Sequence, residues 1–485
     1  MTHSPWTKNH PAPRRRALDA DAACDVVIIG AGMAGLCTAY HLVREGLRVI
    51  VLDDGPVGGG ETGRTTAHLV NALDDRYYNL AAHFGEEGAR LAAQSHTLAI
   101  DAIEEVARDV PCELMRLDGY LFGDEDVLDK ELVACRRAGL DVELVERVPW
   151  LSFDSGLALR FPRQAQMHPL LFLDGLLHHV ERGGGRVFTG SHADIIEGGY
   201  PARVVANGCT VSAGAVVVAT NTPVNDRFTV HLKQGAYRTY VIGIEVKGTA
   251  PHVLLWDTEV PYHYVRTAGD ILMVGGEDHK VGQGKDGFGR LEQWARARFP
   301  CGDVLHRWSG QIMEPADGLA FIGHNPVDED NVFIATGDSG NGMTHGMIAG
   351  ILLTDMIVGR KNAWESLYDP RRLTLAVEPL VNLAQYAEWV APHGSEAVLP
   401  GHGAVVRRGL SLVAVSCDEV GARRECAAVC PHLKGVVTFN ETEQTWDCPV
   451  HGSRFTLAGR VLNGPANRGL GRVEERTDDV ELTVK

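Results

Sequence analysis

The chain has 485 residues, of which 45% are hydrophobic and 22% charged, and this is the composition of a globular protein with a large core and more than one domain. Its formal net charge of −17 argues against nonspecific binding to nucleic acid or to an anionic membrane surface. No stretch approaches the ~18 uninterrupted apolar residues of a membrane span, and the ten cysteines mostly stand singly in apolar segments, as is typical of a cytoplasmic protein.

The first 23 residues predict a surface arm. They contain Arg14-Arg15-Arg16, which resembles part of a twin-arginine export signal. Leu18-Asp19-Ala20-Asp21 follows where an export signal would continue with an apolar stretch, so no such signal is expected.

A dinucleotide-binding fingerprint begins at Val26. The hydrophobic run Val26–Ile29 predicts a buried parallel strand, and a helix follows a glycine-rich turn. Gly30 permits the turn, Gly32 lets backbone N–H groups approach a pyrophosphate, and Gly35 lets the helix pack closely on the strand. A second strand ends at Asp53, where a carboxylate accepts hydrogen bonds from an adenosine ribose. The glycines alone are also compatible with a structural turn, but both strands, the helix and the acid together favour a dinucleotide site.

A second polar loop follows this fingerprint. The glycine-rich residues 55–63 lead to Arg64, Thr65 and Thr66, which suit a loop that folds over a phosphate or runs past a flat ring. A polar surface loop is the alternative.

Residues 75 to 225 alternate between predicted helices and strands. We expect a helix over 75–109 with a break near Gly85, a strand over 117–122, a charged helix before Gly139, a strand over 141–145 and a helix from Pro169 to Val180. Strands over 186–189 and 203–205 precede an apolar strand that runs from Gly214 into Ala219-Thr220-Asn221. That polar turn is expected to return beside Gly30.

Residues 234–274 change to alternating, aromatic-rich strands, which predict an antiparallel sheet that roofs a flat cofactor. Alternation along the strand places Tyr262 and Tyr264 on one face and His263 on the other. A purely structural role for these three residues is the alternative. A helix over 288–299 and a strand over 304–312 follow.

A further buried strand, 331–336, repeats the theme of strand, glycine loop and helix N-terminus. The loop 337–346 precedes an apolar helix over 347–358, and backbone donors there can stabilise negative charge such as that of a reduced flavin. Beyond it, residues 361–398 predict a helical linker with an amphipathic segment at 375–390.

The C-terminal part, from residue 399, predicts a small β domain with a metal centre. Cys430-Pro431-His432 and Cys448-Pro449-Val450-His451 give each of two loops one thiolate and one imidazole, the ligands of a Rieske [2Fe–2S] centre. A zinc site is the alternative, although zinc fingers usually place a cysteine pair before a histidine pair. Cys426 is expected to be a buried thiol. Gly435 and Val450 stand where some Rieske proteins carry an additional disulfide.

The motifs from Cys24 to about Gly359 resemble FAD-dependent oxidoreductases of the D-amino-acid oxidase superfamily, in the glycine and sarcosine oxidase branch. With residues 399–485 the chain resembles the bacterial subgroup that carries a C-terminal Rieske domain. The resemblance implies an α/β FAD-binding Rossmann-like domain, an antiparallel-sheet substrate domain and a C-terminal all-β Rieske domain. Its expected boundaries are an N-terminal arm at 1–23, FAD-binding parts at about 24–110, 160–225 and 305–360, substrate-domain parts at about 111–159 and 226–304, a linker at 361–398 and the Rieske domain at 399–485.

The resemblance also implies two cofactors, FAD and a [2Fe–2S] cluster, and oxidation of a C–N bond by hydride transfer to flavin N5. The expected FAD-binding residues are Gly30, Gly32, Gly35, Asp53, Arg64, Thr65, Thr66, Ala219, Asn221, Gly337, Gly340, Asn341, Gly342, Met343 and Thr344, and the expected cluster ligands are Cys430, His432, Cys448 and His451. Noncovalent FAD is expected, because His68 lies offset from the histidine that holds FAD covalently in some relatives.

One departure bears on the substrate. Amino-acid oxidising relatives place an arginine before the Asp317-Gly318 pair, but this chain has Gly310-Gln311-Ile312-Met313-Glu314 there. Glu314 is therefore expected to attract a cationic amine, while Arg266 or Arg238 could replace the missing carboxylate clamp. Tyr264 and His345 complete the predicted catalytic set with Arg266 and Glu314.

The favoured function is a dehydrogenase that oxidises a C–N bond of an amine or amino-acid-like substrate and passes electrons from flavin through the cluster to an external acceptor. An oxygen-using amine oxidase, an NAD(P)H-dependent reductase and a redox sensor without an amine substrate are the alternatives. Only one dinucleotide fingerprint is evident, whereas such reductases usually show two. A Rieske oxygenase is disfavoured, because no second domain offers two histidines and one carboxylate for mononuclear iron. The acceptor and the oligomeric state stay open.

Overall fold

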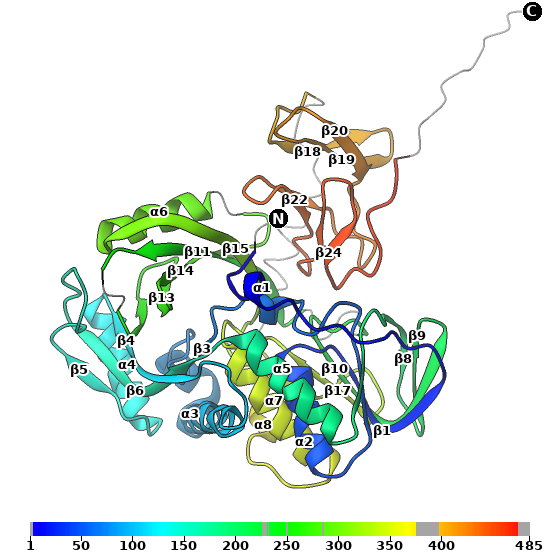
Figure 1. The fold of residues 1–485 in the computed structure, drawn as a ribbon, viewed down its shortest axis with the longest axis horizontal. Coiled ribbons are helices and arrows are strands. Elements are labelled where there is room, and N and C mark those ends of the chain that lie inside the picture. The colour runs from blue at the N-terminus through cyan, green and yellow to red at the C-terminus, as the bar shows by residue number, and fades with distance from the viewer. Residues whose placement is uncertain are drawn as a thin grey trace, which may run out of the picture. The chain divides into compact units, whose positions relative to one another are not determined.

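The computed structural model describes residues 3–225, 230, 232–248, 251–283, 286–374 and 397–473 (Figure 1). The chain forms two compact units, Met1–Val381 and Asn382–Lys485, which are described separately. The predicted amphipathic segment at 375–390 lies outside the described residues.

An eight-stranded sheet in the first unit carries the nucleotide-binding half of the fold. Its strands run in the order β16-β17-β10-β1-β2-β7, and the hairpin of β8 and β9 extends it from β10. The pairs β10–β1, β1–β2, β2–β7 and β10–β17 are parallel. The strands are β1 (Ala22–Ile29), β2 (Val49–Leu52), β7 (Arg186–Phe188), β8 (Ala193–Glu197), β9 (Ala202–Ala206), β10 (Cys209–Asn221), β16 (Phe321–His324) and β17 (Val332–Thr336).

Both faces of this sheet are covered, which is why its strands are continuous apolar runs. Val26 and Ile28 of β1 face one core, which they share with helices α2 (Met33–Arg44), α5 (Pro169–Arg182) and α7 (Gly342–Ile357) (Figure 1). Val27 and Ile29 face a second core on the side of β8 and β9. The expected helix from Pro169 is confirmed, with His168 as its N-cap, whereas β8 was not expected from the sequence.

A nine-stranded sheet forms the other half of the first unit. Its order is β15-β11-β14-β13-β12-β4-β6-β3, with β5 on β6, and its pairs are antiparallel apart from β12–β4. The strands are β3 (His68–Leu69), β4 (Met115–Phe122), β5 (Glu143–Val145), β6 (Ala158–Gln166), β11 (Gln234–Val246), β12 (Leu254–Asp257), β13 (His263–Ala268), β14 (Ile271–Lys280) and β15 (Cys301–Pro315).

The helices of this half follow the predicted pattern. Helix α3 (Tyr77–Ala107) contains the expected break at Gly85, whose φ is 73°. Helix α4 (Glu125–Arg137) begins at Asp124, whose side chain accepts a hydrogen bond from the Val127 N–H group. Helix α6 (Gly287–Arg298) packs its apolar side chains on one face of β11 and β14. The short helices α1 (Trp6–Asn9), η1 (Glu61–Arg64) and α8 (Glu365–Tyr368) complete the unit. No helix among the described residues is long and apolar enough to cross a membrane.

The N-terminal residues are more than a surface arm, so that prediction is wrong for part of them. Trp6 is 3% exposed and Leu18 is 4% exposed. The Ser4 hydroxyl donates to the carbonyl of Gly63 at 2.6 Å, and the Trp6 indole donates to the carbonyl of Thr65 at 2.7 Å. The first residues therefore hold the loop that follows β2.

The second unit is all-β and antiparallel in its described part. One sheet contains β18 (Gly403–Arg408), β19 (Ser411–Cys417) and β20 (Arg423–Ala427), and the other contains β21 (Thr438–Asn440), β22 (Thr445–Asp447), β23 (Arg454–Phe455) and β24 (Val461–Asn463). Arg454 is buried and forms ion pairs with Asp447 at 3.0 Å and Glu443 at 2.7 Å. This network ties the segment before one metal loop to the segment after it.

We predict that Arg372→Met destabilises the first unit by about 3–5 kcal/mol, because it leaves a buried carboxylate unpaired. Arg372 binds both oxygens of Asp317 at 2.8 Å and lies over the Phe321 ring. The matched control is Arg371→Gln, since Arg371 forms an exposed pair with Asp369 that is worth about 1 kcal/mol or less. Urea unfolding followed by tryptophan fluorescence measures both changes. Equal midpoints for the two variants would contradict the prediction.

Candidate cofactor and substrate sites

The glycine turn after β1 brings three backbone segments into contact. Gly30 has a φ of 107°, and a Cβ atom there would overlap the carbonyl oxygen of Ala219. A Cβ atom on Gly35 would overlap the carbonyl oxygen of Gly30. The turn at the end of β10 therefore returns beside Gly30, as the sequence predicts, and this contact requires glycine at both positions.

At two helix N-termini the N-cap residue's own side chain caps none of the first backbone N–H groups. Helix α2 begins after Gly32, and helix α7 begins after Asn341. The hydroxyl oxygen of Thr62 accepts a hydrogen bond from the Met33 N–H group at 3.1 Å at the first of them. Uncapped N–H groups at a helix N-terminus attract phosphate and other anions. This geometry fits FAD with its pyrophosphate at α2 and a polar edge of the flavin at α7.

Asp53 lies at the end of β2, as predicted, but its carboxylate contacts the backbone. Its Oδ2 atom accepts from the Ala31 N–H group at 2.6 Å, and Oδ1 accepts from Gly55 at 2.7 Å. Burial raises the pKa of Asp53 to about 6. The carboxylate thus fixes the glycine turn through the Ala31 N–H group. A contact between Asp53 and a ribose stays a prediction.

The loop containing Arg64, Thr65 and Thr66 is held from several sides, which argues against the alternative of a polar surface loop. The Trp308 indole donates to the carbonyl of Arg64 at 2.7 Å, and Arg64 Nη1 donates to the carbonyl of Ser309 at 3.1 Å. The Thr66 hydroxyl lies 3.0 Å from Nδ1 of His68, and Thr66 is buried. Burial lowers the pKa of His68 to about 3, so its imidazole is neutral.

Neither arginine predicted as a substrate clamp has a guanidinium group available on the tyrosine face. We use this name for the side of the sheet on which Tyr262 and Tyr264 lie. Arg266 is buried, and its Nη1 atom donates to the carbonyls of Thr66, Ala67 and Met167 at 2.7–3.1 Å. Burial lowers the pKa of Arg266 to about 9. Arg238 precedes Thr239, which faces Tyr264, so strand alternation places Arg238 on the opposite face of β11. The geometry gives Arg266 the role of fixing the loop and does not support its prediction as a clamp.

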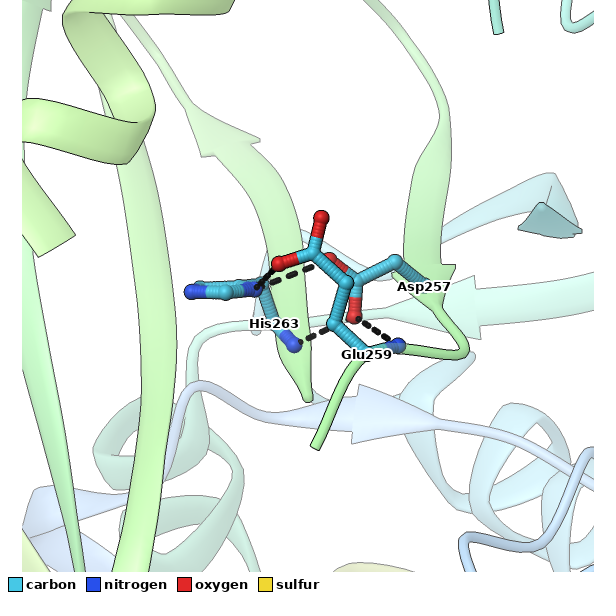
Figure 2. Close-up of side chains that lie close together, drawn as sticks. All are labelled: Asp257, Glu259 and His263. Carbon is cyan, nitrogen blue, oxygen red and sulfur yellow. Dashed lines mark hydrogen bonds and ion pairs between the residues drawn. The ribbon is translucent and has the colours of Figure 1, made fainter. Parts of the chain in front are cut away.

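The two tyrosines lie together and His263 points away from them, as predicted. The rings of Tyr262 and Tyr264 are 5.8 Å apart. Figure 2 shows His263 together with Asp257 and Glu259, and the Nδ1 atom of His263 lies 2.8 Å from Asp257 Oδ2. The His263 ring also stacks on Trp294 of α6 at 4.5 Å.

The group of Asp257, Glu259 and His263 has the composition of a metal site, but its atoms already have partners. Asp257 Oδ1 accepts from the His263 N–H group at 2.8 Å, and Glu259 pairs with Arg298 at 3.1 Å. These contacts satisfy the group without an ion. We interpret it as the tether that fixes the strand carrying the tyrosines.

His345 packs in the interior near the start of α7. Its Nδ1 atom lies 2.9 Å from the carbonyl of Asp338, and its ring meets the ring of His96 at 4.6 Å. Burial lowers the pKa of His345 to about 4, which keeps it neutral. A catalytic role for His345 stays a prediction.

Sequence reasoning missed the acidic residues beside the tyrosines. The Tyr262 hydroxyl donates to Asp74 Oδ2 at 3.1 Å, and the Ser339 hydroxyl donates to Asp75 Oδ2 at 2.6 Å. Ser339 belongs to the loop before α7, so this loop, the tyrosines and the two acids meet. The available signal was the consecutive pair Asp74-Asp75 directly after an apolar run. Glu314, which the sequence did predict, is close enough to Tyr262 to raise the pKa of that tyrosine together with burial and other acids.

The second unit brings the four predicted metal ligands together. The rings of His432 and His451 lie 5.1 Å apart, and both Cys430 and Cys448 are buried. The Cys430 N–H group donates to Gly435 at 2.8 Å, and the Cys448 N–H group donates to Ser453 at 2.7 Å. Two thiols and two imidazoles in two tight loops fit the ligand set of a [2Fe–2S] cluster.

Gly435 faces the second metal loop, as expected. A Cβ atom there would lie 2.5 Å from Val450 and 2.9 Å from the Cys448 sulfur. The two positions that carry a disulfide in some Rieske proteins therefore face each other here without one. None of the ten cysteines forms a disulfide, and Cys426 is buried, as predicted.

The folds and the two sites together define a flavin- and iron–sulfur-dependent oxidoreductase. The model of FAD dependent oxidoreductases matches residues 25–356, and that of the Rieske [2Fe-2S] domain matches residues 388–474. The chain belongs to the FAD-dependent oxidoreductase family and carries a Rieske domain. The expected fold class, the FAD and the [2Fe–2S] cluster are confirmed, and the zinc alternative is excluded.

Relatives agree with this assignment. The Rieske 2Fe-2S iron-sulfur protein YhfW of Bacillus subtilis is 31% identical over 97% of both chains. The gamma-glutamylputrescine oxidoreductase of Escherichia coli is 25% identical over 70% of this chain and 85% of its own length. The structure of glycine oxidase from Geobacillus kaustophilus shares the fold with a TM-score of 0.62 and 19% identity, over 73% of this chain and 100% of that one.

We predict that Gly35→Ala weakens FAD binding by roughly 5- to 150-fold, because overpacking costs about 1–3 kcal/mol. The added methyl group would push α2 away from the glycine turn. The control is Gly471→Ala, whose Cβ atom would lie 3.6 Å from Ala427, an ordinary contact. Titration of apo-protein with FAD measures both affinities. Unchanged binding in Gly35→Ala would contradict the role of the turn.

We also predict that Cys430→Ser removes the cluster and leaves bound FAD unchanged, because a serine hydroxyl is a poor ligand for this iron. The control is Cys426→Ala, which removes a nearby buried thiol outside the ligand set. Iron content and the EPR spectrum of the reduced cluster show whether each variant retains the cluster, and flavin absorbance shows whether it retains FAD. Retention of the cluster in Cys430→Ser would disprove the ligand assignment.

Proposed function

We propose that this protein is an amine dehydrogenase that oxidises a C–N bond and delivers the electrons to an external acceptor through its Rieske domain. Bound FAD accepts two electrons as a hydride, and a Rieske cluster relays electrons singly. The observation that carries the amine assignment is the acidic and phenolic character of the tyrosine face, where Asp74 and Glu314 lie near Tyr262. The name of the Escherichia coli relative, a gamma-glutamylputrescine oxidoreductase, also indicates an amine derivative.

The residues of the chain would contribute position rather than strong acid–base chemistry. Tyr262 and Tyr264 lie on the side of the sheet that meets the loop before α7, where the flavin is predicted to lie. Tyr264 is fixed by its contact with the hydroxyl of Thr239 at 2.8 Å, and Tyr262 is fixed by Asp74. Rings held in this way confine a substrate amine against a flat cofactor, and proximity then supplies much of the rate.

The missing carboxylate clamp separates this chain from an amino-acid oxidase. Arg266 is engaged by three carbonyl groups, and Arg238 projects from the other face of β11. An α-amino acid would therefore lose the bidentate contact that an arginine gives to a carboxylate. We propose an amine without an α-carboxylate as the substrate.

The test is anaerobic mixing of the full chain with amines, amino acids and NAD(P)H, with flavin absorbance and cluster EPR as readouts. We expect an amine to bleach the flavin and the cluster signal to follow. In Cys448→Ser the amine is expected to bleach the flavin without a cluster signal, since a cluster ligand is missing. Cys426→Ala serves as the control and should retain both signals.

Two results would overturn the proposal. Bleaching by NAD(P)H alone would identify a reductase. Undiminished oxygen-dependent turnover in Cys448→Ser would identify an oxidase in which the cluster is accessory.

A further inference from the structure

The tyrosine face contains an acid–tyrosine cluster, which we define as Asp74, Asp278, Tyr262 and Tyr264. Tyr262 donates to Asp74, and the negative charges of Asp278 and Asp74 both act on the two tyrosines. Burial, followed by these charges, raises the pKa of Tyr262 and of Tyr264 well above the usual tyrosine value. The phenols therefore stay protonated, and the cluster has carboxylates as its anionic groups.

Asp278 is aimed by a β-bulge. The register of β11 and β14 shifts between Arg238 and Tyr240, where Glu277 and Asp278 lie opposite Thr239. Glu277 has a φ of 58°, in the left-handed region that few non-glycine residues adopt. Bulges redirect side chains and are frequent beside active sites. The backbone thus takes an unfavourable conformation at the residue before Asp278.

Asp278 forms no ion pair with any residue that the structure describes, and Thr239 and Tyr262 are the polar groups beside it. Both of its oxygen atoms are shielded from solvent, and neither accepts a hydrogen bond of good geometry from the described residues. Thr239 and Tyr262 lie near enough to moderate its pKa, which burial raises to about 7. A buried carboxylate without a cationic partner or well-formed hydrogen bonds costs free energy, so its presence requires an explanation.

Basic side chains near the cluster do not neutralise it. No ion pair to Asp74 or Asp278 forms among residues that the structure describes. Arg76 is the cation that acts on Asp74, but its guanidinium donates to the carbonyls of Leu73 at 3.2 Å and Asp257 at 3.4 Å. Among the described residues, the cluster therefore lacks a compensating cation, and a bound ligand from outside the chain would supply it.

The chemistry of amine oxidation indicates whether the bound cation is the reacting amine of the substrate or a second amine. A carboxylate stabilises the protonated form of an amine beside it. An amine must be neutral to release a hydride, because its nitrogen lone pair forms the new C=N bond as the hydride and a proton leave. The ammonium group held by the carboxylates is therefore a second group that does not react.

We propose that Asp278 and Asp74, with Tyr262, bind the non-reacting ammonium group of a diamine or polyamine substrate and so determine specificity. This inference rests on the proposed function and names the substrate class of the same site.

The test compares α,ω-diaminoalkanes, from 1,3-diaminopropane to 1,5-diaminopentane, with n-alkylamines of matched length on the anaerobic full chain. The best diamine is expected to half-reduce the flavin at a concentration about 30-fold below that of the matched monoamine. The monoamine lacks the second ammonium group, and a desolvated charge pair that loses one partner weakens binding by about this factor. Asp278→Asn is expected to raise the concentration for the diamine about 30-fold and to leave the monoamine unchanged. Asp74→Asn should act in the same direction.

The matched control is Asp270→Asn, which changes an exposed acid in the turn of the same hairpin, between β13 and β14. Flavin content and thermal unfolding establish that each variant is folded. If Asp278→Asn does not fold, the comparison of diamine with monoamine in the unaltered chain decides the question.

The outcomes separate this inference from the proposed function. If monoamines and diamines reduce the flavin equally well, or if Asp278→Asn affects both equally, the subsite is disproved while amine oxidation stands. If only NAD(P)H reduces the flavin, the proposed function and the subsite are both disproved.

Discussion

The structure depends on the close approach of three backbone segments at the end of β1. Gly30 contacts the carbonyl of Ala219, and Gly35 contacts the carbonyl of Gly30, so that strand, turn and helix meet with no side chain between them. Asp53 links this turn to the loop after β2, because its carboxylate accepts hydrogen bonds from the N–H groups of Ala31 in the turn and of Gly55 in the loop. Helix α2 begins directly after this turn, and its N-cap residue, Gly32, has no side chain to cap the first N–H groups. This close approach is possible only because Gly30 and Gly35 have no Cβ atom.

The loop after β2 is held in place by residues from three other parts of the first unit. Trp6 holds it from the N-terminal arm, Trp308 from β15 and Arg266 from β13. A charged guanidinium within the core would be costly if it were unpaired, and three carbonyl groups compensate it. Arg266 therefore stabilises the shape of the site. This explains why an arginine on a substrate-domain strand need not contact a substrate.

Local patterns in the sequence predict most of the helices and strands and the glycine-rich loops, because glycine spacing and apolar periodicity depend on residues close together in the chain. The break at Gly85, the turn at Ala219 and the four metal ligands follow from such patterns. The position of Arg266 did not, since its three partners lie about 100 to 200 residues away in the chain. The burial of Trp6 was missed for the same reason. Asp278 could not be identified either, because its orientation depends on a bulge that only the pairing of β11 with β14 creates.

The distribution of charge across β13 connects these observations. His263 on one side of the strand is paired with Asp257 and stacked on Trp294, so the charged groups there are satisfied. Tyr262 and Tyr264 on the other side face Asp74 and Asp278, and neither of these acids forms an ion pair with a residue that the structure describes. Alternation along a single strand therefore separates a neutralised structural face from an acidic one. Because a buried charge without a cationic partner is costly, the proposed ammonium group of the substrate would compensate the charge of the acidic face.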